Sequence, residues 1–249
     1  METVAASTDL AGPAKVDSSF IWRRLHSLSG LVPIGAYLCF HIYENLAVLR
    51  GADAYNETIN HVNTMLPRAY FYLIELALVI GPLLFHSLYG FYIASTGRSN
   101  VGAYPYPSNW AYWVQRASGY VAFIYLVFHV GVLRLAVTLG GNHLARVSPP
   151  AQGQLDVVTY ADVAAHLGNP EAMAVQSWMA GTHMFVIYVV GTLLTIFHFT
   201  NGLNGFAWTW GLAVGRVAQA RVRVFGWALF VALSVATLNI LFKIRFGAA

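Results

Sequence analysis

Four of the nine histidines lie deep inside long apolar runs of the chain. They are His41, His86, His129 and His198. An ionisable side chain in such a run is costly to bury, so each one points to a function by default. A neutral imidazole can ligate haem iron or a transition metal, and it can also form a hydrogen bond between helices. The chemistry of the chain therefore depends on how these rings are arranged.

The elements that must position these rings are membrane-spanning helices. Of the 249 residues 57% are hydrophobic and 10% charged, whereas about a quarter of the residues of a soluble domain are charged. A hydrocarbon core about 30 Å thick needs roughly 20 apolar residues per helix. The windows that meet this length are Leu28–Leu49, Phe71–Ser95, Trp113–Thr138, Trp178–Thr200 and Val224–Phe242. We expect an all-α membrane protein, one domain of five transmembrane helices.

Loop charge predicts the orientation of the bundle. Basic residues are more frequent on the amino-terminal side, and the short loop before the last span adds Arg216, Arg221 and Arg223 there. By the positive-inside rule the amino terminus lies in the cytoplasm. Basic residues occur singly or in pairs, without the stripe that tracks phosphates, so we expect no nucleic-acid partner.

Helix rise places the four histidines at two depths. His41 and His129 lie about 20 Å above the cytoplasmic boundary, whereas His86 and His198 lie about 10–15 Å deep. Each pair comes from two helices that run in the same direction. Two stacked planar cofactors clamped between four helices need this arrangement, and two imidazoles fill both axial positions of a haem iron. The spacing therefore favours two bis-histidine haems inside the bundle.

Small residues near the histidines favour close approach of a porphyrin ring. Gly90 and Gly202 each follow an inner histidine by four residues and so share its helix face. The matching residues for the outer pair would be Gly30, Gly35 and Gly119. Small residues also permit close helix–helix contact, so this pattern alone does not distinguish a porphyrin site from ordinary helix packing.

Two other interpretations of the histidines stay open. A single intramembrane histidine is more often a hydrogen-bond partner between helices than a ligand. Imidazole also suits zinc or copper, although no carboxylate or thiol accompanies the pairs at the same depth. Glu44, almost one turn beyond His41, is the nearest such group in sequence.

The loop at 140–177 is the only long one, and it faces outward in this topology. Thr159 to Asp162 resembles a capping box before a short helix, and Asn169-Pro170 is typical of an N-cap and first helical residue. We expect a small surface helix over the outer mouth of the bundle.

The segments around the histidines resemble one family, the di-haem cytochrome b membrane anchors of succinate:quinone oxidoreductases, in which one five-helix polypeptide carries both haems. The similarity runs from Arg23 to Phe246. The segments that carry it are Arg23-Arg24-Leu25-His26-Ser27-Leu28, Phe40-His41, His86-Ser87-Leu88-Tyr89-Gly90, Asn109-Trp110, Gln115-Arg116 and Phe197-His198-Phe199-Thr200-Asn201-Gly202-Leu203.

This resemblance implies roles for the histidines and for partner proteins. His41 and His129 match the ligands of the distal haem, and His86 and His198 match those of the proximal haem. A flavoprotein and an iron–sulfur subunit on the cytoplasmic side would oxidise succinate and deliver electrons, so the anchor alone has no such activity. The anchor passes them to quinone, with menaquinone favoured, in the cell's inner (cytoplasmic) membrane. Ile196 stands where some fumarate-reducing relatives have a glutamate for proton return, which disfavours that pathway here.

Charged and polar residues at the cytoplasmic ends of the spans are candidates for binding the propionates of the inner haem. They are Arg24, His26, Ser27 and Arg116. His26 and Ser27 match a family segment with this role. For Arg23 and Arg24, simple anchoring at the membrane surface is an equal explanation.

A quinone pocket needs an apolar slot with a few proton-exchanging groups. On the outer side the candidates are Glu57, His61 and Glu75, with Glu44 a weaker one. Glu75 precedes His86 by 11 residues and so lies about 16 Å farther out. The alternative for the glutamates is that each is a solvated acid at the membrane interface, and this explanation fits Glu57 better than Glu75.

Two further functions compete with the succinate dehydrogenase anchor. One is a cytochrome b subunit of another quinone-linked dehydrogenase. The other is a histidine-lined metal transporter, which would be expected to show internal repeats and a polar path. The five unequal spans show no such repeat.

Overall fold

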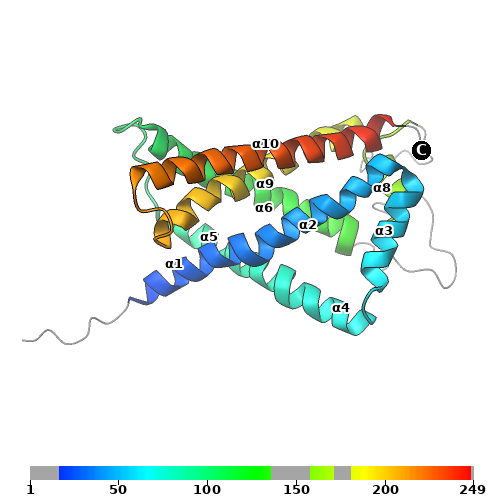
Figure 1. Cartoon of the computed structure of the whole chain (residues 1–249), viewed down its shortest axis with the longest axis horizontal. Coiled ribbons are helices and arrows are strands. Elements are labelled where there is room, and N and C mark those ends of the chain that lie inside the picture. Colours follow the sequence, from blue (N-terminus) through cyan, green and yellow to red (C-terminus); the bar gives the residue numbers. More distant parts are fainter. Residues whose placement is uncertain (1–16, 136–157, 171–180, 248–249) are drawn as a thin grey trace, which may run out of the picture.

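Every regular element that the structure describes is a helix (Figure 1). The computed structural model describes residues 17–135, 158–170 and 181–247. Within these ranges, five helices are long and apolar enough to cross a membrane. They cover Ser18–Arg50, Arg68–Thr96, Pro107–Arg134, Thr182–Thr209 and Arg216–Phe246. The expected all-α membrane fold with five spans is therefore confirmed.

The first two spans each contain a π-helical turn beside a proline. The first span consists of α1 (Ser18–Ser29), the π turn η1 (Gly30–Ile34), α2 (Gly35–Asn45) and the 3-10 turn η2 (Leu46–Arg50). The second span consists of α4 (Arg68–Glu75), the π turn η3 (Leu76–Ile80) and α5 (Gly81–Thr96). Pro33 lies within η1, and Pro82 is the second residue of α5, separated from the end of η3 by one residue. A proline cannot donate a helix hydrogen bond and its ring crowds the preceding turn, which a wider turn relieves. The two turns contact each other across the bundle.

The remaining three spans pack around α9. They are α6 (Pro107–Val130) with the π turn η4 (Gly131–Leu135), α9 (Thr182–Thr209) and α10 (Arg216–Phe246). Helix α9 contacts both α6 and α10 along its length. Gly191 of α9 lies against the ring of Tyr125, and a Cβ on Gly226 of α10 would come within 3.0 Å of the carbonyl oxygen of Thr200. These small residues let the backbones approach closely, as in other membrane helix pairs.

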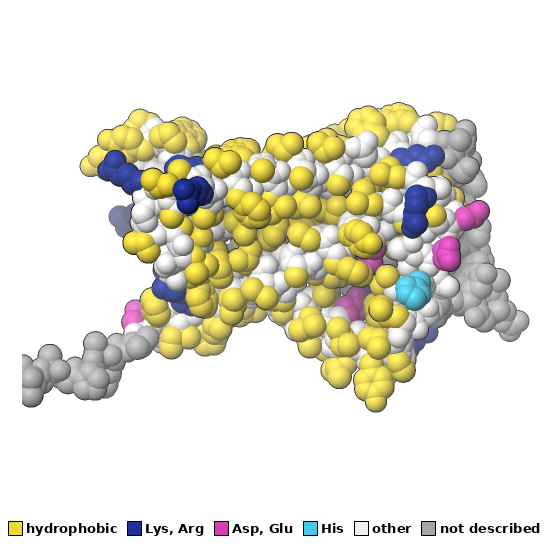
Figure 2. All heavy atoms as spheres, viewed as in Figure 1, with side chains coloured by type: hydrophobic (Ala, Val, Ile, Leu, Met, Phe, Trp, Pro, Cys, Tyr) yellow, Lys and Arg dark blue, Asp and Glu magenta, His cyan; other side chains and the backbone are white. Residues whose placement is uncertain are grey.

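The outer surface of the bundle is apolar over most of its length. Figure 2 shows hydrophobic side chains along the middle of the molecule, with most of the visible Lys and Arg side chains near its two ends. Ile124 is 69% exposed and Leu78 57% exposed. Large apolar side chains in such positions face lipid rather than water, which fits a membrane-spanning bundle.

Two short helices, α3 (Ala52–Thr64) and α8 (Tyr160–His166), lie together at one end of the bundle (Figure 1). We call this the outer end, and the opposite end, with Ser18 and Thr209, the inner end. The predicted capping box of α8 is confirmed: the Asp162 carboxylate accepts from the Thr159 backbone at 2.8 Å, and the Thr159 hydroxyl accepts from the Asp162 backbone at 3.3 Å.

The expectation that this helix lies on the surface is wrong, because nearly all of α8 is buried. Its side chains pack against Tyr55 of α3 and against α10, and the Tyr160 backbone donates to the Asn56 side chain at 2.8 Å. Burial also raises the pKa of the Tyr55 phenol. The Asn169 side chain donates to the carbonyl oxygen of Ile244 at 2.7 Å. The helix expected after Asn169-Pro170 falls on residues 171–180, outside the described ranges.

Candidate haem-binding core

The inner pair of histidines meets between the second and fourth spans. The ring centroids of His86, on α5, and His198, on α9, are 6.1 Å apart and the ring planes are at 86°. His86 Nδ1 lies 2.9 Å from the carbonyl oxygen of His26, and His198 Nδ1 lies 3.0 Å from that of Gln115. A carbonyl oxygen can only accept, so Nδ1 carries the proton in both rings. Each Nε2 is then left with a free lone pair.

The outer pair meets between the first and third spans. His41, on α2, and His129, on α6, have ring centroids 5.9 Å apart and planes at 73°. The His41 Nδ1 atom lies 2.8 Å from a carboxylate oxygen of Glu44, so its Nε2 is also left as the free ligand. His129 Nδ1 is buried and has no hydrogen-bond partner among the described residues.

The separation of the rings fits a metal ion held by two imidazoles. Two metal–nitrogen bonds of about 2.0–2.1 Å on opposite sides of one ion, together with the ring radii, place the centroids about 6 Å apart. Both pairs have this separation, at 5.9 and 6.1 Å. Ligating histidines also commonly donate their second ring nitrogen to a carbonyl or carboxylate, as three of these four do. The residues present therefore fit two bis-histidine haems.

Glycines surround the inner pair rather than the outer one. A Cβ on Gly30 would collide with the His86 ring, and a Cβ on Gly119 would lie 2.9 Å from Cε1 of His198. The expectation that Gly30 and Gly119 belong to the outer pair is therefore wrong. Each lies in the first or third span but faces a histidine of a neighbouring helix, since the rotation of a helix decides which ring its glycine meets.

The other predicted glycines have different neighbours. A Cβ on Gly90 would lie 3.0 Å from His26 Nε2, and one on Gly202 would lie 3.4 Å from the Gln115 side chain. Gly35 faces the Phe199 ring. Gly90 and Gly202 thus lie near the inner pair, as expected. The nearest side chains to a Cβ at these positions, however, are His26 and Gln115, which contact the ligands, and not the ligands themselves.

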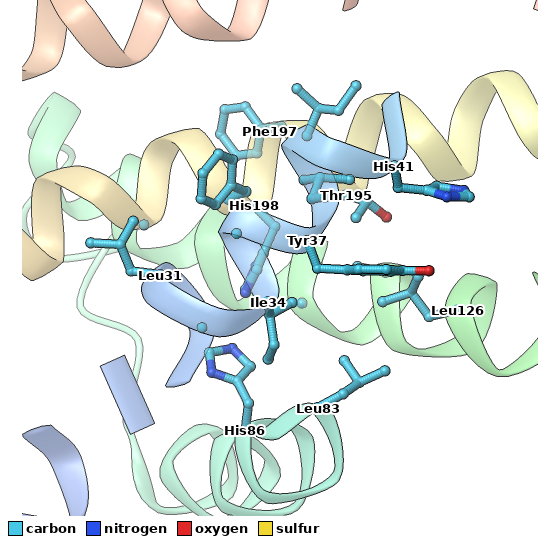
Figure 3. A pocket seen from close by; sticks show the side chains of 18 of the residues that line it. Leu31, Ile34, Tyr37, His41, Leu83, His86, Leu126, Thr195, Phe197 and His198 are labelled. Atoms are coloured by element: carbon cyan, nitrogen blue, oxygen red, sulfur yellow. The ribbon is translucent and has the colours of Figure 1, made fainter. Parts of the chain in front are cut away.

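A cavity of about 1630 Å³ connects the two pairs and is lined by all four rings. In Figure 3, His86 and His198 point toward each other across it, while His41 lies farther along the bundle beyond Tyr37. Single small-molecule pockets are typically about 300–1,000 Å³, so this cavity has room for more than one cofactor. Its remaining lining is mostly apolar, with residues such as Leu31, Ile34 and Leu126.

The candidate propionate residues lie at the inner end of this cavity. The rings of His26 and His86 are stacked, with centroids 4.1 Å apart and planes at 8°. The Ser27 hydroxyl donates to the Arg24 carbonyl oxygen and accepts from Trp210 Nε1 at 3.0 Å. The Arg24 guanidinium lies over the Trp210 ring, 5.1 Å from its centroid. Arg24, His26 and Ser27 are therefore brought together beside the inner pair.

Arg116 has a different set of contacts. Its guanidinium donates to the carbonyl oxygens of Ala94 and Gly97 at the carboxyl end of α5. A cation that binds the last carbonyls of a helix stabilises that end. Arg116 lines the cavity as well, so its observed contacts are structural while its position remains compatible with a propionate.

The candidate quinone residues separate into two groups. Glu75 lines the outer part of the cavity and forms a bidentate ion pair with Arg134, at 2.9 and 2.7 Å. Glu57 and His61 are exposed on α3 and are not among the residues that line the cavity. Of the candidates, Glu75 and the weaker one, Glu44, therefore lie beside the space that a quinone would enter.

Several residues of this core are absent from the sequence-based candidates. Arg134 binds Glu75, Tyr37 stacks on His41 with centroids 5.7 Å apart, and Gln115 donates to the His198 carbonyl oxygen at 2.9 Å. Tyr37 precedes His41 by four residues and Gln115 belongs to a segment of the family resemblance. Helix periodicity could have identified Tyr37, since residues four apart share a face.

Within the described residues, no group of three or more His, Cys, Asp and Glu side chains converges as it would around one metal ion. The histidines are grouped in twos, which is the number of axial positions on a haem iron. This arrangement suits haem better than a transition-metal transit site.

Comparison with known proteins identifies the family. No family model matches the chain, and no solved structure matches it. The succinate dehydrogenase cytochrome b558 subunit of Bacillus subtilis (strain 168) is 34% identical over 223 residues, which cover 90% of this chain and 96% of that relative. The chain therefore belongs to the family of succinate dehydrogenase cytochrome b subunits.

Proposed function

We propose that this chain anchors a succinate dehydrogenase in the membrane and passes its electrons through two b haems to quinone. The observation that carries the proposal is the pairing of His86 with His198 and of His41 with His129, each at the separation that one iron between two imidazoles requires. The name of the relative, a cytochrome b558 subunit of succinate dehydrogenase, supports both the cofactor and the enzyme.

When bound, the two haems would supply one-electron transfer between the ends of the bundle, since bis-histidine iron has no open position for oxygen. The chain's own residues hold and orient them. The carbonyl oxygens of His26 and Gln115 fix the tautomers of the inner rings and leave their Nε2 atoms available as ligands. Gly30 and Gly119 leave space for these rings.

Polar residues at the inner end would bind the propionates of the inner haem. Arg24, His26 and Ser27 are the main candidates, because they lie together beside His86. Arg116 is a further one, and it also caps α5. Charge-assisted hydrogen bonds to such groups are roughly twice as strong as neutral ones.

The outer part of the cavity is our candidate for the quinone site, with menaquinone the favoured quinone. Glu75, paired with Arg134, is our main candidate there for exchanging protons with a quinol, and Glu44 is a weaker one. The site would exclude water on most sides, since its other walls are apolar. Glu57 and His61 could only serve on the path between this site and the surface.

The inner end is our candidate for docking the other subunits. Its exposed arginines agree with a cytoplasmic face under the positive-inside rule. The flavoprotein and iron–sulfur subunits would bind there, and the amino terminus would lie in the cytoplasm, with the chain in the inner (cytoplasmic) membrane.

Haem content tests the proposal directly. We expect two haems per chain in the purified complex, a strong Soret band, and reduction of both by succinate. His198→Leu should remove the inner haem and leave one haem per chain, whereas His129→Leu should remove the outer one. His183→Leu is the matched control, because His183 is an exposed histidine on the same helix as His198. A colourless complex, or the same loss in the control, would refute the proposal.

A further inference from the structure

The two pairs of histidines differ in the charge of the groups that hold them. In the inner pair both Nδ1 atoms bind neutral backbone carbonyl oxygens, at 2.9 and 3.0 Å. In the outer pair, His41 Nδ1 binds a carboxylate oxygen of Glu44 at 2.8 Å. Within the described residues, His41 is the one histidine of the four whose ring nitrogen contacts a carboxylate.

The Glu44 carboxylate is well shielded from solvent. Its side chain is 10% exposed and lies almost one helical turn beyond His41 on the same face of α2. Arg134, which lines the same cavity, forms an ion pair with Glu75. In the part of the chain that the structure describes, the ion-pair partner of Glu44 is therefore the His41 ring itself.

A purely structural role explains Glu44 poorly. The helix end near His41 is already held by Asn45, whose side chain donates to the His41 carbonyl oxygen at 2.7 Å. A carboxylate at this depth is costly when no cation neutralises it. The cost is offset if the positive charge comes from the group that His41 ligates.

We propose that Glu44 is a positioning residue that orients His41 and, through its charge, lowers the reduction potential of the outer haem. A carboxylate that accepts from Nδ1 makes Nε2 a stronger donor to iron and favours the oxidised state. A neutral carbonyl oxygen that accepts from Nδ1 also makes Nε2 a stronger donor, but by less than a carboxylate does. This inference rests on the proposed function, because it requires haem between His41 and His129.

The test is a redox titration of the assembled complex, followed optically, with Glu44→Gln. The substitution keeps the shape of the side chain and removes its charge. We expect the midpoint of the outer haem to rise by about 59 mV, which corresponds to a tenfold change in the one-electron equilibrium constant, while the inner haem keeps its midpoint. The outer haem is identified as the component that His129→Leu lacks.

Asp53→Asn is the matched control, because Asp53 is an exposed acid on α3 at the same end of the bundle. It removes one negative charge without touching a histidine, so neither midpoint should move. An unchanged outer midpoint in Glu44→Gln, or equal shifts in the control, would overturn the inference.

A second variant covers loss of the cofactor. If Glu44→Gln loses the outer haem, Glu44→Asp should retain it, since the charge is kept one methylene farther away. Loss from both variants would show that packing rather than charge is needed and would overturn the inference. Failure of the proposed function can be told apart from failure of this inference, because in that case the unmodified complex would itself contain fewer than two haems per chain.

Discussion

Gly119→Ala tests whether the space beside His198 is needed to hold the inner haem. The added methyl would lie 2.9 Å from Cε1 and 3.3 Å from Nδ1 of His198. Carbon atoms in favourable contact are about 3.5–4.0 Å apart, so the ring must retreat by roughly 0.6 Å. It cannot do so freely, because its Nδ1 is bonded to the Gln115 carbonyl oxygen on the same helix face as Gly119.

The expected size of the effect follows from this geometry. Metal–ligand distances tolerate only about ±0.2 Å, so a displaced ring ligates poorly. Overpacking of a filled site costs about 1–3 kcal/mol, and each 1.4 kcal/mol is about tenfold in affinity. We therefore expect inner-haem affinity to fall roughly tenfold to a hundredfold, although alanine favours helix over glycine by about 0.5–1 kcal/mol.

The assay is the ratio of haem to chain after purification and dilution, measured from the spectrum of the pyridine complex. Gly205→Ala is the control. Gly205 lies on the same helix as His198, and no atom lies within 4 Å of the position that its added Cβ would take. It should keep two haems per chain. Two haems of unchanged affinity in Gly119→Ala would refute the reasoning.

Three other substitutions test the surrounding contacts. Arg134→Gln leaves the Glu75 carboxylate without its bidentate partner, so we expect a lower Tm than for Glu75→Gln; identical melting curves would contradict this. Asp162→Ala removes half of the capping box of α8 and should cost about 1 kcal/mol, seen as a fall in Tm of about 2–4 °C; no change would mean that the cap contributes nothing. Arg116→Ala removes donors to the last carbonyls of α5, and faster hydrogen exchange at that helix end is expected.

The sequence predicted the fold because its signals are local. Runs of apolar residues define membrane helices without knowledge of any partner. The capping box at Thr159 and Asp162 is likewise a short-range pattern, and it begins α8 as expected. The pairing of the histidines needed only the direction of each span and the rise per residue.

What the sequence could not give depends on how the helices are rotated and packed. Gly30 and Gly119 lie beside the inner rings because their helices turn those faces toward α5 and α9. The ion pair of Glu75 with Arg134 joins residues 59 positions apart. The burial of α8 follows from contacts with α3 and α10 that no local pattern encodes.

The location of iron in the assembled complex tests the central claim most directly. Anomalous diffraction measured at the iron absorption edge shows where each iron lies. The account predicts that two peaks lie within this chain, one between His86 and His198 and one between His41 and His129. Absence of iron from either position, or an iron that contacts only one of the paired rings, would contradict it.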